Sequence, residues 1–325
     1  MSGERVGRLS PERLETVLAY HQTLLADRVR NRAFAAALRA RVRPGSAVMD
    51  LGAGSGVWGV LAARLGARRV VAVEKDPLLA RVIERLAWEN GVEDVLRVVE
   101  GDSRHLDLPR SFDLIVSETV GSAAFDEDIV PILADARRRF LKPGGGLVPE
   151  GLALWAAPAP LPEPLGVRPR IVADASFRSL VVHAPSATTP DRFRPLGRPA
   201  RLLEVDLLTA RPPLPLEGLR AGFRVPDGRR VGCIGVWAEL RLAPGVRLAT
   251  RRASSWGVTY FPVDPLPGGP CRFDLELSLL PRPRWRTTCA AGGEVLVRDY
   301  SPLFAYGVAR APAPGERGRK GRSRR

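Results

Sequence analysis

The chain has 325 residues, of which 45% are apolar and 26% charged, and this composition excludes a wholly disordered protein. No apolar run approaches the roughly 20 residues that a membrane-spanning helix needs. The first residues, Met-Ser-Gly-Glu-Arg, do not resemble a signal peptide. Three widely spaced cysteines and three histidines predict neither a disulfide framework nor a metal site. We therefore expect a cytoplasmic protein with no metal and no membrane span.

Positive charge is in excess, with 50 Lys and Arg against 35 Asp and Glu and a formal net charge of +15. Six of the positive charges lie in residues 317–325. Basic charge attracts polyanions such as nucleic acids. However, Arg, Ala, Gly and Pro are all abundant, and a compositional bias produces the same excess. The charge alone therefore leaves nucleic-acid binding open.

The first half of the chain has helical patterns followed by alternating strand and helix patterns. Ser10-Pro11-Glu12 is typical of a helix start, and apolar residues then recur at helical spacing as far as Val29. We predict strands near 47–51, 69–74, 96–100 and 112–118, and helices near 58–65, 77–90 and 128–141. This alternation predicts a parallel sheet covered on both faces. The glycine-rich segment 142–146 predicts a turn that leads into a strand over 147–156.

The second half has little helical periodicity. Short apolar runs at 202–207, 231–240, 256–263 and 273–280 are separated by turns rich in Pro and Gly, which predicts antiparallel strands. The chain is therefore predicted to be an α/β protein in which an antiparallel β-barrel-like domain follows a Rossmann-like domain. Its parts are N-terminal helices over 1–40, the Rossmann-like domain over 41–156, the barrel-like domain over 157–310 and a basic disordered tail over 311–325.

A glycine motif follows the first predicted strand. The segment from Val48 to Gly56 runs from a strand into a Gly-x-Gly-x-Gly turn that opens a helix. Glycines let the backbone approach a ligand closely, and a helix N-terminus favours an anionic group. Glu74 ends the next strand, 20 residues after Gly54, where an acid accepts both hydroxyls of a ribose. Asp102 follows the third strand, where it can hold an adenine amino group.

Together these residues resemble the class I S-adenosylmethionine methyltransferases rather than the dehydrogenases. The resemblance implies S-adenosyl-L-methionine as the cofactor. The predicted cofactor-binding residues in this part of the chain are Asp50, Gly52, Gly54, Gly56, Glu74 and Asp102. Two of them have a structural alternative: Glu74 as a solvated strand end, and Asp102 as a turn former.

Two carboxylates follow the fourth predicted strand and are candidates for the chemistry. Ser117-Glu118 ends that strand, and Glu127 comes nine residues after Glu118. A guanidinium is planar, and each carboxylate can accept two of its N–H groups side by side. Such a pair would orient one guanidine nitrogen for an in-line displacement at a methyl group. The alternative for Glu127 is a solvated acidic loop, because Asp126 and Asp128 are its neighbours.

The loop with these two carboxylates resembles that of the protein arginine methyltransferases, whose two-glutamate loop begins Ser-Glu and has its second Glu nine residues later. Pro131 is similar to the type III, monomethylating branch. The segment 24–30, Leu-Leu-Ala-Asp-Arg-Val-Arg, is similar to the family's Met-Leu-x-Asp-x-x-Arg on a helix that covers the cofactor. The resemblance spans roughly residues 20–300. It implies that Arg30 binds the methionine carboxylate of the cofactor.

Some positions depart from the family pattern. Ser254-Ser255-Trp256 falls where the family has Thr-His-Trp, so a proton acceptor or loop anchor is replaced by Ser255. The resemblance places Trp256 beside the substrate pocket. Small residues at 119, 120 and 122 replace bulky ones and predict an altered entrance. His21 lies on the apolar face of its helix, and we expect it in the core.

These observations predict methyl transfer from S-adenosylmethionine to a guanidine nitrogen, with Glu118 and Glu127 as the catalytic residues and a protein or peptide arginine as the acceptor. Two alternatives stay open: a small guanidine or amine metabolite as the acceptor, and a non-catalytic S-adenosylmethionine-binding partner protein. The intact pair of carboxylates argues against the second. The resemblance also implies a homodimer. Three roles of the basic tail stay open: contact with nucleic acid, methylation in cis and a solubilising charge.

Overall fold

The computed structural model describes residues 11–121, 124–125, 127–161, 193–264, 266–279, 283–291, 294–302 and 309–310. Contacts divide the chain into two compact units. The first comprises Met1–Leu152, Val205–Pro213 and Glu239–Trp256, and the second comprises Ala153–Glu204, Leu214–Ala238 and Gly257–Arg325. In the described part of the chain no helix is both long enough and apolar enough to cross a membrane.

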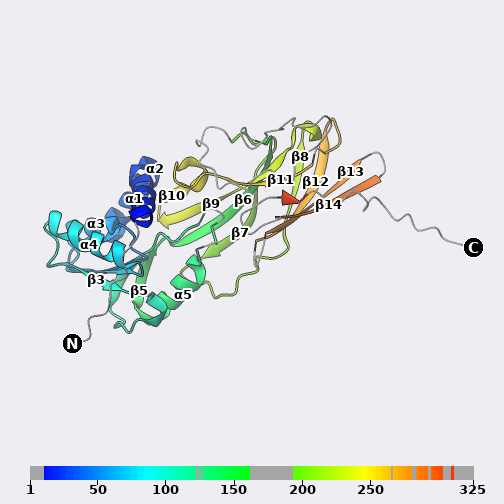
Figure 1. Cartoon of the computed structure of the whole chain (residues 1–325). Coiled ribbons are helices and arrows are strands. Elements are labelled where there is room, and N and C mark those ends of the chain that lie inside the picture. Colours follow the sequence, from blue (N-terminus) through cyan, green and yellow to red (C-terminus); the bar gives the residue numbers. More distant parts are fainter. Residues whose placement is uncertain are drawn as a thin grey trace, which may run out of the picture. The chain divides into compact units, whose positions relative to one another are not determined.

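The first unit is built on a parallel five-stranded sheet (Figure 1). Its order is β3-β2-β1-β4-β5, with β1 at Ala47–Leu51, β2 at Arg69–Glu74, β3 at Leu96–Glu100, β4 at Phe112–Val116 and β5 at Leu141–Val148. The connecting helices are α3 (Val57–Arg64), α4 (Pro77–Glu89) and α5 (Ile129–Arg139). Strands β1 and β2 are buried almost throughout, as expected for apolar runs covered on both faces. The predicted Rossmann-like domain is confirmed.

This strand order determines where a ligand can bind. The order reverses between β1 and β4, because the chain runs outward through β2 and β3 before it returns to β4. In open α/β sheets ligands bind beyond the carboxyl ends of the strands at such a switch point. The loops after β1 and β4 therefore define the candidate site, and they carry the glycine motif and Glu118.

Two local predictions were wrong. The segment 142–146 is no turn between strands but part of β5, where Phe112 pairs with Leu141 and Leu114 pairs with Gly146. The extra residues bulge from the ladder, and Gly144 accommodates the bulge with a φ of +76°. The first helical pattern is also interrupted: α1 (Pro11–Ala26) ends before Asp27, and α2 (Arg28–Arg41) begins after it.

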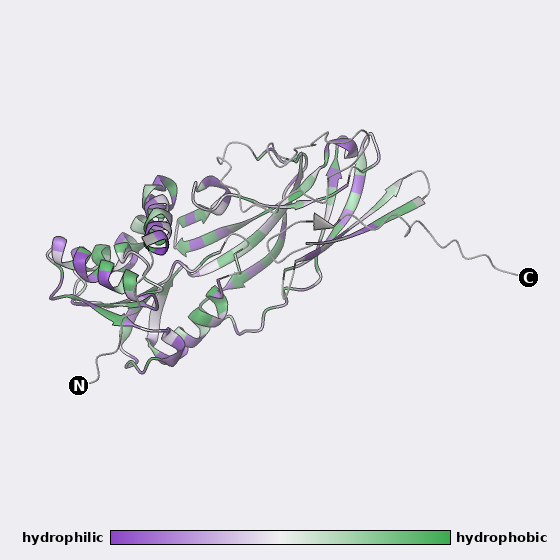
Figure 2. Ribbon diagram, in the orientation of Figure 1, coloured by the Kyte–Doolittle hydropathy of each residue, from purple (hydrophilic) through white to green (hydrophobic). Residues whose placement is uncertain are grey.

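The remaining strands form two further sheets, as predicted for the second half of the chain. One sheet has the order β10-β9-β6-β7, with β11 paired to β9, and the other has the order β15-β14-β13-β12-β8. Their strands are β6 (Gly151–Ala159), β7 (Ala200–Asp206), β8 (Leu219–Val225), β9 (Cys233–Ala243), β10 (Val246–Ala249), β11 (Thr259–Pro262), β12 (Cys271–Ser278), β13 (Arg284–Ala291), β14 (Glu294–Pro302) and β15 (Ala309–Arg310). Hydropathy and burial alternate along β8 and β12, which pair antiparallel (Figure 2).

The first unit contains a buried carboxylate, Glu150, that pairs with neighbouring arginines. Glu150 is 6% exposed and lies between two arginines: it forms an ion pair with Arg41, and its Oε2 is 3.6 Å from Nε of Arg241. Its backbone N–H also donates to the Arg241 carbonyl at 2.7 Å. The carboxylate thus joins α2 to β9 within this unit.

We expect Glu150→Gln to lower the free energy of unfolding by about 1–3 kcal/mol. Breaking a fully buried ion pair costs about 3–5 kcal/mol, and partial exposure of both arginines reduces that figure. Urea denaturation of the variant would measure the change. Glu84→Gln, an exposed position on α4, is the matched control and should stay within about 0.5 kcal/mol of the unsubstituted chain. Equal stability of the two variants would contradict the structural role of Glu150.

Candidate active site

The glycine motif forms the floor of the site. Gly52, Gly54 and Gly56 have φ values of +68°, +56° and +76°, which side-chain-bearing residues rarely adopt. A Cβ atom on Gly52 would lie 2.8 Å from Cγ2 of Thr119, and one on Gly54 would lie 2.8 Å from Cε1 of His21. Glycine is therefore favoured here by the backbone conformation, and an added side chain would also have to displace the side chain of Thr119 or His21.

A pocket of about 450 Å³ lies above this loop and brings together most of the predicted site residues. The predicted residues that line it are Arg30, Gly52, Gly54, Glu74, Asp102, Glu118 and Glu127. Asp50, Gly56 and Trp256 are not among the lining residues. Further lining residues, which the sequence reasoning did not assign to the site, include Tyr20, His21, Leu24, Leu25, Lys75, Arg104, Thr119 and Asp128.

Asp50 lies beneath the pocket and holds the start of α3. Its side chain is buried, and Oδ2 accepts a hydrogen bond of 2.7 Å from the backbone N–H of Gly59. Burial raises the pKa of Asp50 to about 8, although the Gly59 bond opposes the rise. Direct contact between Asp50 and a cofactor stays a prediction. The structure shows this side chain in contact with the protein's own backbone.

Glu74 lines the pocket and organises the glycine loop. Its Oε2 accepts from the Gly54 N–H at 2.7 Å, and its Oε1 accepts from the Asp76 N–H at 2.9 Å. Each carboxylate oxygen can accept more than one hydrogen bond, so acceptor capacity remains for a bound diol. The predicted contact with ribose hydroxyls is compatible with this geometry.

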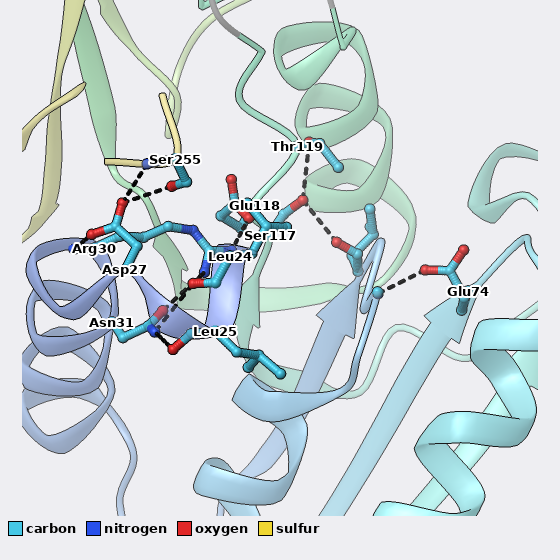
Figure 3. A network of polar contacts seen from close by, with 12 residues as sticks. Leu24, Leu25, Asp27, Arg30, Asn31, Glu74, Ser117, Glu118, Thr119 and Ser255 are labelled. Carbon is cyan, nitrogen blue, oxygen red and sulfur yellow. Dashed lines mark hydrogen bonds and ion pairs between the residues drawn. The ribbon is translucent and has the colours of Figure 1, made fainter. Parts of the chain in front are cut away.

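Arg30 and Glu118 form an ion pair at the centre of the site (Figure 3). Arg30 is 3% exposed, and its Nη1 donates to Oδ1 of Asn31 at 2.9 Å and to the Leu24 carbonyl at 3.3 Å. Its guanidinium carbon lies 5.7 Å from the centroid of the Trp256 ring. Trp256 therefore packs against the arginine and is not among the residues that line the pocket, and its place beside a substrate stays a prediction.

A second contact anchors the helix that carries Arg30. Asp27 caps α2 by accepting from the Arg30 N–H at 3.0 Å through Oδ1. Its Oδ2 accepts from both the N–H of Ser255 at 2.8 Å and the Ser255 hydroxyl at 2.7 Å (Figure 3). Burial raises the pKa of Asp27, but the bonds from Arg30 and Ser255 outweigh burial and lower it below its usual value. Ser255 thus holds Asp27 at the start of α2, although it replaces the histidine of the family pattern.

The two carboxylates have different surroundings. Burial raises the pKa of Glu118 to about 7; Arg30 opposes the rise, whereas the charge of Glu127 adds to it. Glu127 is exposed and lines the same pocket. Of the small residues expected to alter the entrance, Thr119 lines the pocket and Val120 is 1% exposed in the core. Positions 122 and 126 lie outside the described residues.

His21 belongs to the pocket rather than to the apolar core. It is half-buried, lines the pocket and packs over Gly54. Burial lowers its pKa, an effect that nearby Glu74 opposes and Arg30 supports. The available signal was its position three and four residues before Leu24 and Leu25, which lie on the same face of α1 and also line the pocket.

The residues of the pocket fit S-adenosylmethionine by their chemistry. Arg30 offers a buried cation for a carboxylate, and its Nε has no hydrogen-bond partner among the described residues. The glycine loop allows close approach of a ligand, Glu74 can accept from a diol, and Asp102 can accept from an amino group. These features match the amino-acid, ribose and base portions of that cofactor in turn.

Comparisons with known proteins identify chains that are similar to this one. A family model described as a methyltransferase domain matches residues 48–145. An arginine N(omega)-methyltransferase of Streptomyces achromogenes subsp. streptozoticus is 34% identical over 265 residues, 76% of this chain and 72% of that protein. A protein arginine N-methyltransferase PRMT10 of Oryza sativa subsp. japonica is 37% identical over 142 residues, 43% of this chain and 37% of that protein. The chain thus spans just over a third of the rice protein's length.

Solved structures share the fold. Arabidopsis thaliana protein arginine methyltransferase 10, described in a uniquely open conformation, has a TM-score of 0.70 at 21% identity and covers 87% of this chain and 98% of its own. A Trypanosoma brucei PRMT1 enzyme-prozyme heterotetrameric complex with AdoHcy has a TM-score of 0.70 at 19% identity over 86% of this chain and 96% of its own. The fold and the glycine loop define a class I methyltransferase. The chain belongs to the arginine N-methyltransferase family.

We expect Ser255→Ala to weaken binding of S-adenosylhomocysteine by about 0.5–1.5 kcal/mol, because Asp27 loses one of its hydrogen bonds and holds the Arg30 helix less firmly. Isothermal titration calorimetry would measure the affinity. Ser254→Ala removes the same atom from the exposed neighbouring residue and should leave the affinity unchanged. The anchor role of Ser255 is contradicted when both variants bind with equal affinity.

Proposed function

We propose that this protein transfers a methyl group from S-adenosyl-L-methionine to a guanidine nitrogen of arginine. The observation that carries the proposal is the convergence of Glu118 and Glu127 on the pocket that the glycine loop, Glu74 and Arg30 also line. A pocket with a cofactor end and a paired-carboxylate end suits a cationic acceptor beside a sulfonium donor.

In the proposed function, one group of pocket residues binds the cofactor and another binds the acceptor. We propose that Arg30 holds the carboxylate of the cofactor, that Glu74 holds the ribose and that Asp102 holds the base. S-adenosylmethionine supplies an electrophilic methyl group on a positively charged sulfur. Glu118 and Glu127 each accept N–H groups of the substrate guanidinium and fix one nitrogen in line with that methyl group.

Glu118 is also placed to respond to the charge of the acceptor. Its buried carboxylate has a pKa raised to about 7, so a bound guanidinium stabilises the ionised form. As the nitrogen forms its new bond to carbon and the bond from carbon to sulfur breaks, the nitrogen must lose a proton. We propose that this proton leaves by way of Glu118, the carboxylate that pairs with the guanidinium in the proposed complex.

The acceptor is proposed to be an arginine of a protein or peptide. Free arginine is a second candidate, because the Streptomyces relative that aligns with most of this chain is named an arginine, and not a protein arginine, methyltransferase. Incubation with labelled S-adenosylmethionine and either an arginine-glycine peptide or free arginine would separate the two. Label in neither acceptor, from a protein that binds the cofactor, would contradict the proposal.

Several finer expectations stay predictions. Pro131 and the family resemblance support monomethylarginine as the product, and acid hydrolysis with mass spectrometry would identify it. A homodimer and a contact of the basic tail with nucleic acid are proposed from the sequence. The resemblance places the dimerisation arm between Glu150 and Leu202, and residues 162–192 of that region lie outside the described residues, as does the tail over 311–325. A cytoplasmic location and the four-part division of the chain are likewise proposals.

We expect Glu118→Gln to abolish turnover while S-adenosylhomocysteine still binds, because the amide keeps the shape but cannot pair with a guanidinium. Glu127→Gln should lower turnover by about 10-fold or more, since it removes one charge-assisted hydrogen bond worth about 1.5–3 kcal/mol. Single-turnover assays and calorimetry would measure the two quantities. Glu84→Gln makes the same change on the exposed face of α4 and should keep both. Wild-type turnover of Glu118→Gln would contradict the assignment.

The pH dependence should follow Glu118. Below pH about 7 this carboxyl is protonated and cannot pair with a guanidinium, so kcat/KM should fall as the pH drops through that value and should level off above it. A profile of kcat/KM from pH 5 to 9 would measure the midpoint. A flat profile over this range would show that Glu118 remains ionised throughout or takes no part.

A further inference from the structure

The loop after β3 presents a pair of opposite charges to the pocket. Asp102 and Arg104 both line the pocket, and the Nε–Nη2 edge of the Arg104 guanidinium donates hydrogen bonds to the Asp102 carboxylate. Nε of Arg104 lies 3.0 Å from Oδ1 and Nη2 lies 2.6 Å from Oδ2, while the Arg104 backbone N–H donates to Oδ1 at 3.0 Å. These bonds hold the pKa of Asp102 well below its usual range. Asp102 is therefore an ionised acceptor in a fixed orientation.

The loop that carries this pair is held by another arginine. The guanidinium of Arg139, on α5, donates to the carbonyls of Ser103 at 2.7 Å and Leu106 at 2.6 Å, and its Nη1 lies 3.3 Å from the Arg104 carbonyl. Gly101 also donates to the Glu74 carbonyl at 2.8 Å, which ties the loop to the end of β2. The position of the pair is thus set by the protein before a ligand binds.

The order of the strands shows which part of the cofactor would reach this pair. Along the edge of the sheet, Glu118 follows β4, the glycine loop follows β1, Glu74 ends β2, and the Asp102–Arg104 loop follows β3. Adjacent strands lie about 4.8 Å apart, so β3 and β4 are separated by about 14 Å. With the methyl group beside Glu118 and the ribose at Glu74, the base lies at the β3 end.

On this basis, which rests on the proposed function, we infer that Arg104 is a further cofactor-recognition residue that reads the adenine base together with Asp102. The amino edge of adenine presents a donor, N6–H₂, flanked by the acceptors N1 and N7. Asp102 supplies an acceptor for the amino group. Arg104 supplies a donor for a ring nitrogen beside it, because its Nη1 takes no part in the bonds to Asp102.

Calorimetry with S-adenosylhomocysteine and its 1-deaza and 7-deaza analogues tests this inference. The unsubstituted protein should bind one of the two analogues, the one that lacks the ring nitrogen contacted by Arg104, about three- to tenfold more weakly than S-adenosylhomocysteine. The reason is that this analogue cannot accept the hydrogen bond from Arg104. Arg104→Ala should bind S-adenosylhomocysteine more weakly by a similar factor and should no longer distinguish that analogue. Arg97→Ala, which removes the same charge from an exposed position on β3 outside the pocket lining, should behave like the unsubstituted protein.

The outcomes separate this inference from the proposed function. An Arg104→Ala protein that keeps full affinity, or that still distinguishes the analogue as strongly as before, overturns the direct contact while the cofactor assignment stands. If the unsubstituted protein and Arg97→Ala both fail to bind S-adenosylhomocysteine, the cofactor assignment falls and this inference falls with it. Thermal unfolding without ligand should be the same for both arginine variants, because each position is exposed.

Discussion

The ion pair between Arg30 and Glu118 is the contact on which the rest of the site depends. It joins α2 to the loop after β4, two segments 88 residues apart in the chain. Both side chains are almost fully buried, so each charge would be costly without the other. Both residues line the pocket, so under the proposed function the pair places the cofactor and the acceptor next to each other.

The surrounding contacts serve to hold this pair in place. Asp27 caps the helix of Arg30 and is itself bound by Ser255, so a loop from the second half of the chain stabilises the cofactor end of the pocket. The aromatic ring of Trp256 packs beside the guanidinium. Burial without full compensation leaves Glu118 with a raised pKa, which a cationic acceptor would lower. Under the proposed function, binding of the acceptor and ionisation of Glu118 are therefore coupled.

Much of the first unit could be predicted from sequence because its signals are local. Short apolar runs that alternate with helical patterns located the strands at 47–51, 69–74 and 96–100, and the glycine motif located the pocket floor. The bulge at 142–146 was missed because a glycine cluster is typical of a turn as well. The bond between Asp27 and Ser255 joins residues 228 apart, and no local pattern encodes such a contact. Nor does a local pattern show that residues 205–213 and 239–256, from the second half of the chain, belong to the first unit.

The most direct measurement is a crystal structure of the protein with S-adenosylhomocysteine and an arginine-containing peptide. We expect the Arg30 guanidinium to lie within hydrogen-bond distance, about 3 Å, of both the homocysteine carboxylate and Glu118. We also expect the peptide guanidinium to contact Glu118 on the side that faces the sulfur. A homocysteine carboxylate bound away from Arg30, or a peptide arginine held without Glu118, would contradict the central role of this ion pair.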